Sequence, residues 1–539
     1  MSTHRHINAI CLIVLVFTLA LTVLFMNGRS FGLRTVTEAE AEEDSDSLWF
    51  TANDRNDGWS VDGATKISLE GGKAVVRGGG AYFYDRSVII TGPGRYVISG
   101  TLDDGSVVVD TDSEAKVWIR LNGADIRCSD SACIRVEQAE KVFLTLEEGT
   151  ANRLETSGFS DAALEDGVDG ALFSRDDLAL NGKGSLEVRS SGANGIVSND
   201  DLLIADGNIT VSADGDGIHA NDALRIGDAS LTISAGDDGI ALTGVESGLI
   251  VVSGRVNLRS GDNGLAAGDS VLLLGGDLTI DAGSDGVNAA GTVRLEDGSL
   301  TVTARDDGIH ADTAVEIAGG TLNIPDCYEG IEAKTIDISG GETDIRPVDD
   351  GMNANGNPER EETWIHISGG SVSVVNETAR DTDGLDSNGD ILVSGGSLRV
   401  SMLNSGSNNA LDFGAEIGGV MQISGGNVVA CGSYSSARSF GSGSTQVSIL
   451  YNIRRGIAGG AELRLEDEKG SVLLEYEVPC SFSSVVLSCP EMKAGRTYRL
   501  VVGDLSDEIT LTAVSSAFGD AESSSFDGPM TPSNLGFGG

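Results

Sequence analysis

Short runs in which apolar and polar residues alternate recur from residue 161 to about residue 440. Residues 223–226, 292–295 and 300–302 are typical of them. An alternation with a period of two indicates a strand with one buried and one exposed side. The pattern therefore predicts short strands separated by tight corners.

These runs belong to a repeat that is marked by Asp or Asn, then Gly, then an aliphatic residue. Most successive glycines of this step are 22 residues apart, and each period holds three strand-like runs. A repeat of this length without helical spacing predicts an all-β, right-handed, three-faced parallel β-helix with about 22 residues per coil. The glycines of the step are Gly170, Gly195, Gly217, Gly239, Gly264, Gly286, Gly308, Gly330, Gly351 and Gly384.

The pattern changes on both sides of this region. Residues 48–160 have strand-like runs without the strict period, which predicts irregular coils ahead of the regular β-helix at 161–440. Longer strands at 441–514 predict a small antiparallel β module that caps the open end of the solenoid. Residues 515–539 are rich in Ser and Gly, so we predict a disordered tail there.

The N-terminus has a different character. Residues 7–26 contain no charged side chain and are long enough to cross a bilayer. They predict a transmembrane anchor, with a cleaved signal peptide as the alternative. Residues 1–6 would be a short cytoplasmic end and residues 27–47 an acidic linker. We therefore expect the rest of the chain on the extracellular face of the membrane, or secreted if the segment is cleaved.

The net charge of the chain restricts the classes of partner that it can bind. The chain has 82 acidic and 36 basic residues, a formal net charge of −46. Such a charge repels phosphate, so we expect no nucleic-acid partner, whereas cations and anions bridged by cations remain. If the Asp–Gly step falls at one corner of every coil, its carboxylates stack and repel by about 1 kcal/mol per pair in water, and more at lower dielectric.

Calcium fits these carboxylates best, because it takes six to eight oxygen ligands and neighbouring coils can share an ion. Few His and no Cys accompany the acids, which argues against zinc. The alternative is that Asp–Gly serves only as turn chemistry, which explains the doubled acids less well. The predicted calcium ligands are Asp176, Asp177, Asp200, Asp201, Asp214, Asp216, Asp237, Asp238, Asp262, Asp285, Asp306, Asp307, Asp349, Asp350, Asp381 and Asp383.

Evidence for catalysis is weak. His219 and His310 recur in the same motif but lie about four coils apart, so we expect them to be surface residues that cannot act on one bond. A calcium-assisted polysaccharide lyase would need a Lys or Arg base beside the metal. Arg305, Arg380 and Lys334 are candidates, although charge compensation explains them better.

The cysteines leave the redox chemistry open. Cys128 with Cys133, and Cys480 with Cys489, could each close a small loop outside the cell. Cys327 and Cys431 are predicted to be single and buried.

The chain resembles a bacterial family of calcium-binding, carbohydrate-binding β-helix proteins with a polysaccharide-lyase-like fold. The residues that carry the resemblance lie at 96–102, 141–146, 149–152, 169–178 and 198–202, followed by the Asp–Gly series. The resemblance implies calcium in the helix and binding of plant-type or acidic polysaccharide without a need for catalysis. Glu329–Gly330 departs from the Asp–Gly pattern, which puts a metal in that coil in doubt.

The sequence thus predicts a calcium-dependent, non-catalytic, cell-surface protein that binds polysaccharide, with an acidic polymer favoured. A calcium-assisted polysaccharide lyase is the first alternative. An adhesin or structural spacer without a sugar site is the second.

Overall fold

The computed structural model describes residues 48–520 except 358–360, 381, 407 and 436. The predicted cytoplasmic end, membrane segment and acidic linker lie outside these residues. Among the described helices, none combines the length and apolarity that crossing a bilayer requires.

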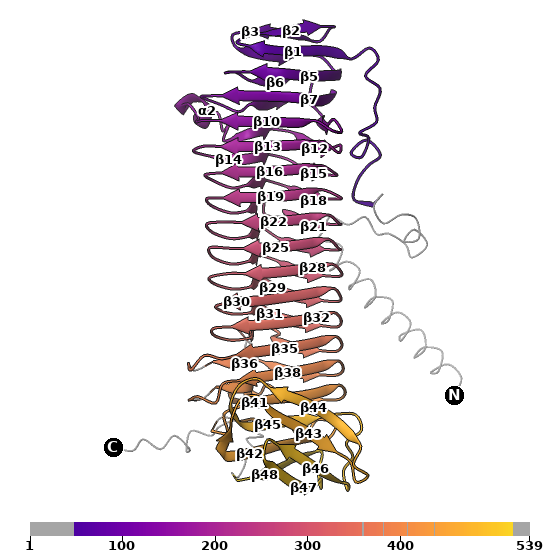
Figure 1. Ribbon diagram of the computed structural model, residues 1–539, viewed down its shortest axis with the longest axis vertical. Coiled ribbons are helices and arrows are strands. Elements are labelled where there is room, and N and C mark those ends of the chain that lie inside the picture. The colour runs from indigo at the N-terminus through magenta and orange to yellow at the C-terminus, as the bar shows by residue number, and fades with distance from the viewer. Residues whose placement is uncertain (1–47, 358–360, 381, 407, 436, 521–539) are drawn as a thin grey trace, which may run out of the picture.

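The described chain winds into a parallel β-solenoid of about 13 turns (Figure 1). Each strand pairs in parallel with the equivalent strands one coil before and one coil after. Ile218, for example, lies between Ile196 and Ile240, an offset of 22 residues on each side. This register confirms the predicted parallel β-helix and the length of its coil.

Three strands per coil build three faces, numbered here in chain order. Face 1 contains β4 (Ser87–Ile90), β6 (Val107–Asp110), β8 (Ile134–Gln138), β11 (Gly170–Ser174), β14 (Asn194–Ser198), β17 (Ile218–Ala220), β20 (Ile240–Leu242), β23 (Leu265–Ala267), β26 (Val287–Ala289), the first parts of β29 (Ile309–Ile317) and β31 (Ile331–Ile338), β33 (Met352–Ala354), β36 (Asp383–Ser387) and β39 (Asn409–Phe413). Face 2 contains β9 (Lys141–Leu146), β12 (Asp177–Asn181), β15 (Leu202–Ile204), β18 (Ala223–Ile226), β21 (Gly248–Val251), β24 (Ser270–Leu273), β27 (Thr292–Leu295), the second parts of β29 and β31, β34 (Trp364–Ile367), β37 (Asp390–Val393) and β40 (Met421–Ile423). Face 3 contains β10 (Ala151–Thr156), β13 (Ser185–Ser190), β16 (Asn208–Ala213), β19 (Ser230–Ala235), β22 (Arg255–Arg259), β25 (Asp277–Asp281), β28 (Ser299–Thr303), β30 (Thr321–Cys327), β32 (Glu342–Pro347), β35 (Ser371–Asn376), β38 (Ser397–Met402) and β41 (Asn427–Gly432).

The core fills the inside of the coil. In β16 and β22 buried and exposed residues alternate strictly, as the period-two pattern predicts. Inward aliphatic side chains stack on their equivalents in the next coil, as Val211 does on Ile233. Each fully buried aliphatic side chain stabilises the fold by about 1.5–3 kcal/mol, so the stack holds the coils together.

The N-terminal end of the solenoid is closed by two antiparallel hairpins. β2 (Ala74–Arg77) pairs with β1 (Thr65–Gly71), and β3 (Ala81–Tyr84) pairs with β4. Below them β1, β5 (Gly94–Leu102) and β7 (Lys116–Cys128) pair in parallel and bend from face 2 into face 3. These strands form irregular coils between residues 65 and 160.

Residues 48–64 do not form a coil, which corrects the predicted start of the solenoid at residue 48. They run back along face 2 as a strap, the indigo trace beside the coils in Figure 1. Phe50 packs on Phe143 and Leu203, and the Trp59 Nε1–H donates to Thr145 Oγ1 at 3.0 Å. The Arg120 guanidinium lies 4.2 Å from the centre of the Trp59 ring.

The C-terminal end carries the predicted antiparallel module. A four-stranded antiparallel sheet has the order β44 (Val472–Val478), β43 (Ala461–Glu466), β46 (Thr497–Val502), β47 (Leu505–Thr510). β45 (Phe482–Ser488) pairs antiparallel with both β41 and β42 (Ser448–Ile457), and so covers the last open strand edge of face 3. The predicted disordered tail is wrong for residues 515–519, because they form β48 (Ser515–Gly519) and hydrogen-bond to β42.

All six cysteines of the described region are free and buried. The two possible disulfides, Cys128 with Cys133 and Cys480 with Cys489, are therefore not formed. Cys327 and Cys431 are buried, as predicted.

Candidate metal and polysaccharide site

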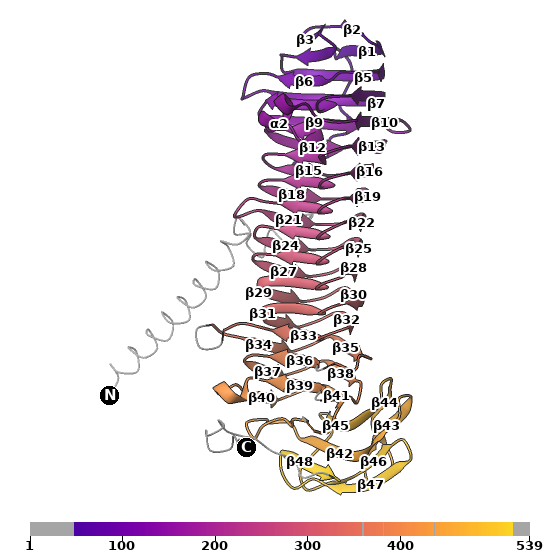
Figure 2. The same ribbon diagram turned by 90° about the vertical axis from the view of Figure 1, so that its left-hand side faces the viewer.

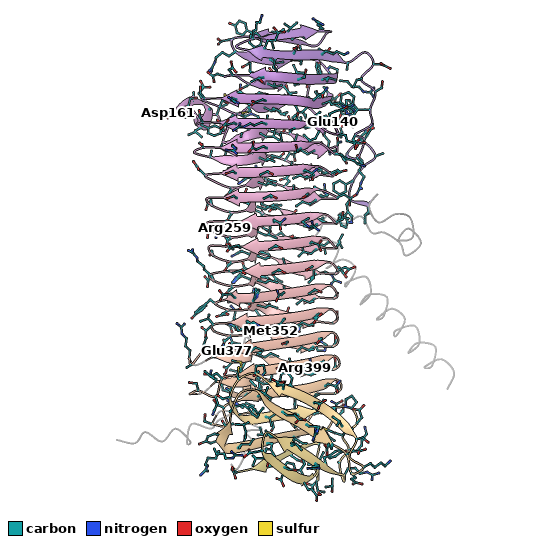
Figure 3. All side chains as sticks on the ribbon, viewed as in Figure 1. Glu140, Asp161, Arg259, Met352, Glu377 and Arg399 are labelled. Carbon is teal, nitrogen blue, oxygen red and sulfur yellow. The ribbon has the colours of Figure 1, made fainter. Side chains whose placement is uncertain are left out.

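The Asp–Gly steps all lie where the chain passes from face 3 to face 1, and this side of the solenoid is called the ladder edge below. Figure 2 shows it turned toward the viewer, and Figure 3 marks the same side with Asp161, Arg259 and Glu377. Helix α2 (Asp161–Glu165) covers its N-terminal part, where Ala163 packs near Phe173 and Val197.

The residue before each glycine performs a structural task. In two runs of coils, from Asn194 to Asp307 and from Asp350 to Asn409, its side-chain oxygen accepts the backbone N–H of the equivalent residue in the next coil, which forms a hydrogen-bonded ladder. Asn194 Oδ1 accepts from Asp216 at 2.8 Å, and Asp383 Oδ1 accepts from Asn409 at 2.8 Å. Asp and Asn both offer this oxygen, which explains why either residue occurs at this position. The other rungs are accepted by Asp216, Asp238, Asn263, Asp285 and Asp350.

The glycine that follows is required by close approach of the coils. A Cβ atom on Gly286 would lie 2.6 Å from the carbonyl oxygen of Gly308, the equivalent residue one coil later. The same distance separates a Cβ on Gly217 from the Gly239 oxygen. Each Asp–Gly step therefore has a backbone reason to exist before any ligand is considered.

The second carboxylate oxygen of several rungs meets the residue three positions further on. Asp216 Oδ2 lies 2.8 Å from His219 Nδ1, and Asp285 Oδ2 accepts from Asn288 Nδ2 at 2.6 Å. His219 and Asn288 belong to an outward row of face 1. The row consists of Phe173, Val197, His219, Ala241, Ala266, Asn288, His310, Glu332, Asn353, Asp386 and Asp412.

Within the described part of the chain, three clusters on the ladder edge consist of carboxylates alone. In each one, an oxygen from every member lies within 4.8 Å of the others. The clusters are Asp237–Asp238–Asp262, Asp285–Asp306–Asp307 and Asp383–Asp386–Asp412.

Crowding and burial change the acidity of these groups. Burial first, and neighbouring carboxylates next, raise the pKa of Asp383 to about 8 and that of Asp386 to about 6. The same causes raise the pKa of Asp350 to about 7. Near neutral pH, ionising all of these carboxyl groups therefore costs free energy, unless a proton or a cation neutralises part of their charge.

One further cluster includes a histidine. His310 Nδ1 lies 3.1 Å from Asp307 Oδ2 and 3.5 Å from Glu332 Oε2. Hydrogen bonds with Asp307 and then Glu332 raise the pKa of His310 to about 11, and the bond with His310 lowers the pKa of Glu332. A protonated imidazole thus compensates these two acids. His219 and His310 both lie on the outer surface four coils apart, as predicted.

A separate group of acids lies at the corner between faces 1 and 2, away from the ladder edge. Asp200, Asp201 and Asp222 bring their oxygens within 4.8 Å of one another, and Arg225 lies 3.0 Å from Asp201. Asp176 instead accepts the N–H of Ala139 at 2.9 Å.

The predicted ligand set therefore divides between two edges rather than forming a single file. The structure brings Asp200, Asp201, Asp237, Asp238, Asp262, Asp285, Asp306, Asp307 and Asp383 into clusters. Among the described residues, it leaves Asp176, Asp177, Asp214, Asp216, Asp349 and Asp350 outside any cluster of this kind. Asp381 lies outside the described residues.

Sequence reasoning missed Asp222, Glu332, Asp386 and Asp412. The last two follow Asp383 and Asn409 by three residues, the spacing that also separates His219 from Asp216. Writing the coils under one another in register would have revealed this row, because residues of one row repeat at the coil period.

The basic side chains considered as catalytic bases have different neighbours in the structure. Lys334 Nζ forms an ion pair with Glu361 at 3.2 Å. Arg438, which was not a candidate, lies 3.5 Å from Asp412.

Comparison with known proteins bears on the same region. Residues 84–248 and 243–334 match the model of a family described as carbohydrate-binding domain-containing protein. The predicted resemblance to carbohydrate-binding proteins is confirmed. A carbohydrate-binding domain-containing protein of Acetivibrio thermocellus is 40% identical over 133 residues, which are 24% of this chain and 46% of that protein. The matched part thus spans less than half the length of this relative.

Among solved structures, the chain is similar to a polysaccharide lyase-like protein from C. thermocellum, studied as a gadolinium derivative. The two share 28% identity, with a TM-score of 0.36, over 50% of this chain and 96% of the other. The carbohydrate-binding match contains two of the three carboxylate clusters, and the Asp383 cluster lies beyond it.

Proposed function

We propose that the protein binds acidic polysaccharide through calcium ions held on the ladder edge. The observation that carries the proposal is the repetition of carboxylate clusters along one edge of a carbohydrate-binding β-solenoid. A single acidic cluster is common on protein surfaces, but a row of them on a rigid scaffold matches a polymer with repeated charges.

The donor set fits calcium. Each of the three clusters offers only carboxylate oxygens, the ligands that this hard cation prefers. The raised pKa values of Asp383 and Asp386 are the expected mark of acids that lack a counter-charge. Asp383, Asp386 and Asp412 would hold one ion, and the two other clusters would each hold another. The bound ion would supply positive charge that a sugar carboxylate can share.

The spacing of the clusters supports a polymeric ligand. Coils lie about 4.8 Å apart, so the first two clusters, two coils apart, are separated by about 10 Å. The third lies four coils further, at about 19 Å. An extended uronate chain that follows the solenoid axis would reach all three, and each contact would raise the effective concentration for the next.

We further propose that the protein acts outside the cell and is tethered by residues 7–26, whose uncharged sequence supports a membrane anchor. The carboxylates of the first two clusters support a binding role, and His310 beside the second cluster is already paired with Asp307 and Glu332.

Retention on polygalacturonate, in calcium and in chelator, tests the proposal. The wild-type protein should bind in calcium and be released by chelator. The double variant Asp383→Asn and Asp386→Asn should lose at least tenfold in affinity, whereas Asp277→Asn should bind normally. Asp277 is a matched control because it is exposed on face 3 and pairs with Arg255 at 3.4 Å. Binding that ignores both chelator and the double variant would exclude this mechanism, and no binding to any polysaccharide would favour a structural spacer.

A polysaccharide lyase is the second candidate, and the position of Arg438 favours it. Arg438 lies beside Asp412 of the third cluster, so a basic side chain and a candidate metal site are adjacent. In this reaction a base removes the proton on C5, next to the uronate carboxylate whose charge a cation would stabilise, a C4–C5 double bond forms, and the glycosidic oxygen on C4 leaves. Ultraviolet absorbance of unsaturated uronate products should appear with the wild type and vanish with Arg438→Ala. Absence of products from the wild type leaves binding as the function.

A further inference from the structure

Two tyrosines stand exposed on the hairpin that closes the N-terminal end of the solenoid. In β3 the residues alternate, so Ala81 and Phe83 pack on the core while Tyr82 and Tyr84 point outward. Tyr82 is 51% exposed and Tyr84 is 70% exposed. Residues two apart on a strand lie about 6.6–6.8 Å apart on the same side, so the two rings form a row.

The surface beside these rings is apolar. Tyr82 lies opposite Ile89 of β4, and Ile89 in turn lies beside Val108 of β6. Ile89 is half-buried and adds apolar surface beside Tyr82, whereas Val108 is buried and contributes little exposed surface. Tyrosine offers a large face at a small cost in side-chain entropy and keeps its hydroxyl in water, a combination that is common in binding surfaces.

The hairpin is held rigidly. Asp85 and Arg86 form a two-residue turn in which both residues have positive φ, 40° and 69°. This conformation is unfavourable for residues other than glycine, and Arg86 in this turn forms two ion pairs. Its guanidinium lies 2.7 Å from Asp104 and 2.9 Å from Asp130, which ties the turn to the coils below. The rings therefore need little ordering when a ligand binds.

The charges around Tyr82 and Tyr84 determine which classes of ligand can bind there. Arg86 already serves two carboxylates, and Asp85 adjoins Tyr84, so the surroundings are acidic. They repel uronates and anionic lipids, which carry negative charge. Two rings also offer much less area than the roughly 800 Å² per partner of a stable protein interface. A flat, uncharged ligand with apolar C–H faces satisfies all three conditions.

We propose that Tyr82 and Tyr84 form a second carbohydrate subsite, which takes a neutral, extended polysaccharide such as a β-1,4-linked glucan by stacking sugar rings on the tyrosine rings. The proposal rests on the carbohydrate-binding function proposed above, but it needs no cation. The protein would thus hold a neutral polymer at its N-terminal end and an acidic one along the ladder edge.

Affinity electrophoresis in hydroxyethyl cellulose and titration with cellohexaose test the subsite, with chelator present throughout. The double variant Tyr82→Ala and Tyr84→Ala should lose at least tenfold in affinity. Tyr84→Trp should retain binding, because it keeps an aromatic face. Tyr434→Ala is the matched control, since Tyr434 is an exposed tyrosine at the other end of the solenoid. All variants should keep the wild-type thermal transition, because the side chains removed are exposed.

The outcomes separate the two sites. Loss of glucan binding in the double variant, with calcium-dependent retention on polygalacturonate unchanged, supports the subsite. Absence of glucan binding by the wild type, or equal binding by the double variant, overturns it while leaving the calcium site intact. Loss of self-association instead of sugar binding, measured by light scattering, would overturn it in favour of a contact between copies of the chain.

Discussion

Asp383 performs two tasks that one pair of substitutions can separate. Its Oδ1 accepts the Asn409 N–H as a rung of the ladder, and its charge is crowded by Asp386 and Asp412. Asp383→Asn keeps an oxygen for the rung and removes the charge. Asp383→Ala removes both.

The expected magnitudes follow from these contacts. A rise in pKa from 3.8 to about 8 is roughly four units, and at 1.36 kcal/mol per unit it corresponds to an upper bound of about 6 kcal/mol. Solvent screens this half-buried group, so we expect Asp383→Asn to stabilise the calcium-free protein by about 2 kcal/mol at pH 8.5. Loss of the acceptor for a backbone N–H costs about 1–3 kcal/mol, so Asp383→Ala should be less stable than Asp383→Asn by that amount.

Calcium should reverse the ranking. If the wild type binds the ion and Asp383→Asn does not, calcium at 100 times its dissociation constant stabilises only the wild type, by about 2.7 kcal/mol.

Hydrogen exchange at the Asn409 amide is a suitable local assay, because a long repeat protein does not unfold in two states. Exchange should be slow in Asp383→Asn and fast in Asp383→Ala, and urea midpoints should follow the same order. Asp277→Asn should change stability by less than about 0.5 kcal/mol. If Asp383→Asn is no more stable than the wild type in chelator at pH 8.5, the account of crowded charge is wrong. If both Asp383 variants protect the Asn409 amide equally, the account of the ladder is wrong.

Three other predictions follow from the fold. In chelator, thermal stability should fall as pH rises from about 5 to 9, because acids such as Asp383 bind protons more tightly in the folded state than in the unfolded state. Calcium should remove this fall. A stability that stays constant or rises with pH in chelator would contradict the raised pKa values. Trp59→Ala should destabilise the strap by about 3 kcal/mol and open residues 48–64 to proteolysis. Leu48→Ala, which replaces an exposed side chain, should not. If the two variants resist proteolysis equally, Trp59 does not anchor the strap. Gly286→Ala should lower the melting temperature, because its Cβ would meet the next coil, whereas Gly72→Ala, with open space around it, should not.

Much of the architecture follows from the repeat. Alternation and a 22-residue period define the strands, the faces and the register, because a parallel coil places equivalent residues directly above one another. His219 and His310 could be assigned to the surface for the same reason. The strap at 48–64 and strand β48 carry no such period, so their positions depended on contacts with distant strands, such as Trp59 with Thr145.

The same distinction between sequence and tertiary structure holds for the candidate site. The sequence alone determined that Asp or Asn recurs at one position of most coils, because periodicity converts spacing into stacking. Only the tertiary structure decided which oxygens serve the backbone ladder and which remain for a ligand, because that choice depends on where each side chain points. It also joined Asp383 to Asp386 and Asp412, residues of two neighbouring coils, since proximity across a coil boundary is set by the register of the fold and not by distance along the chain.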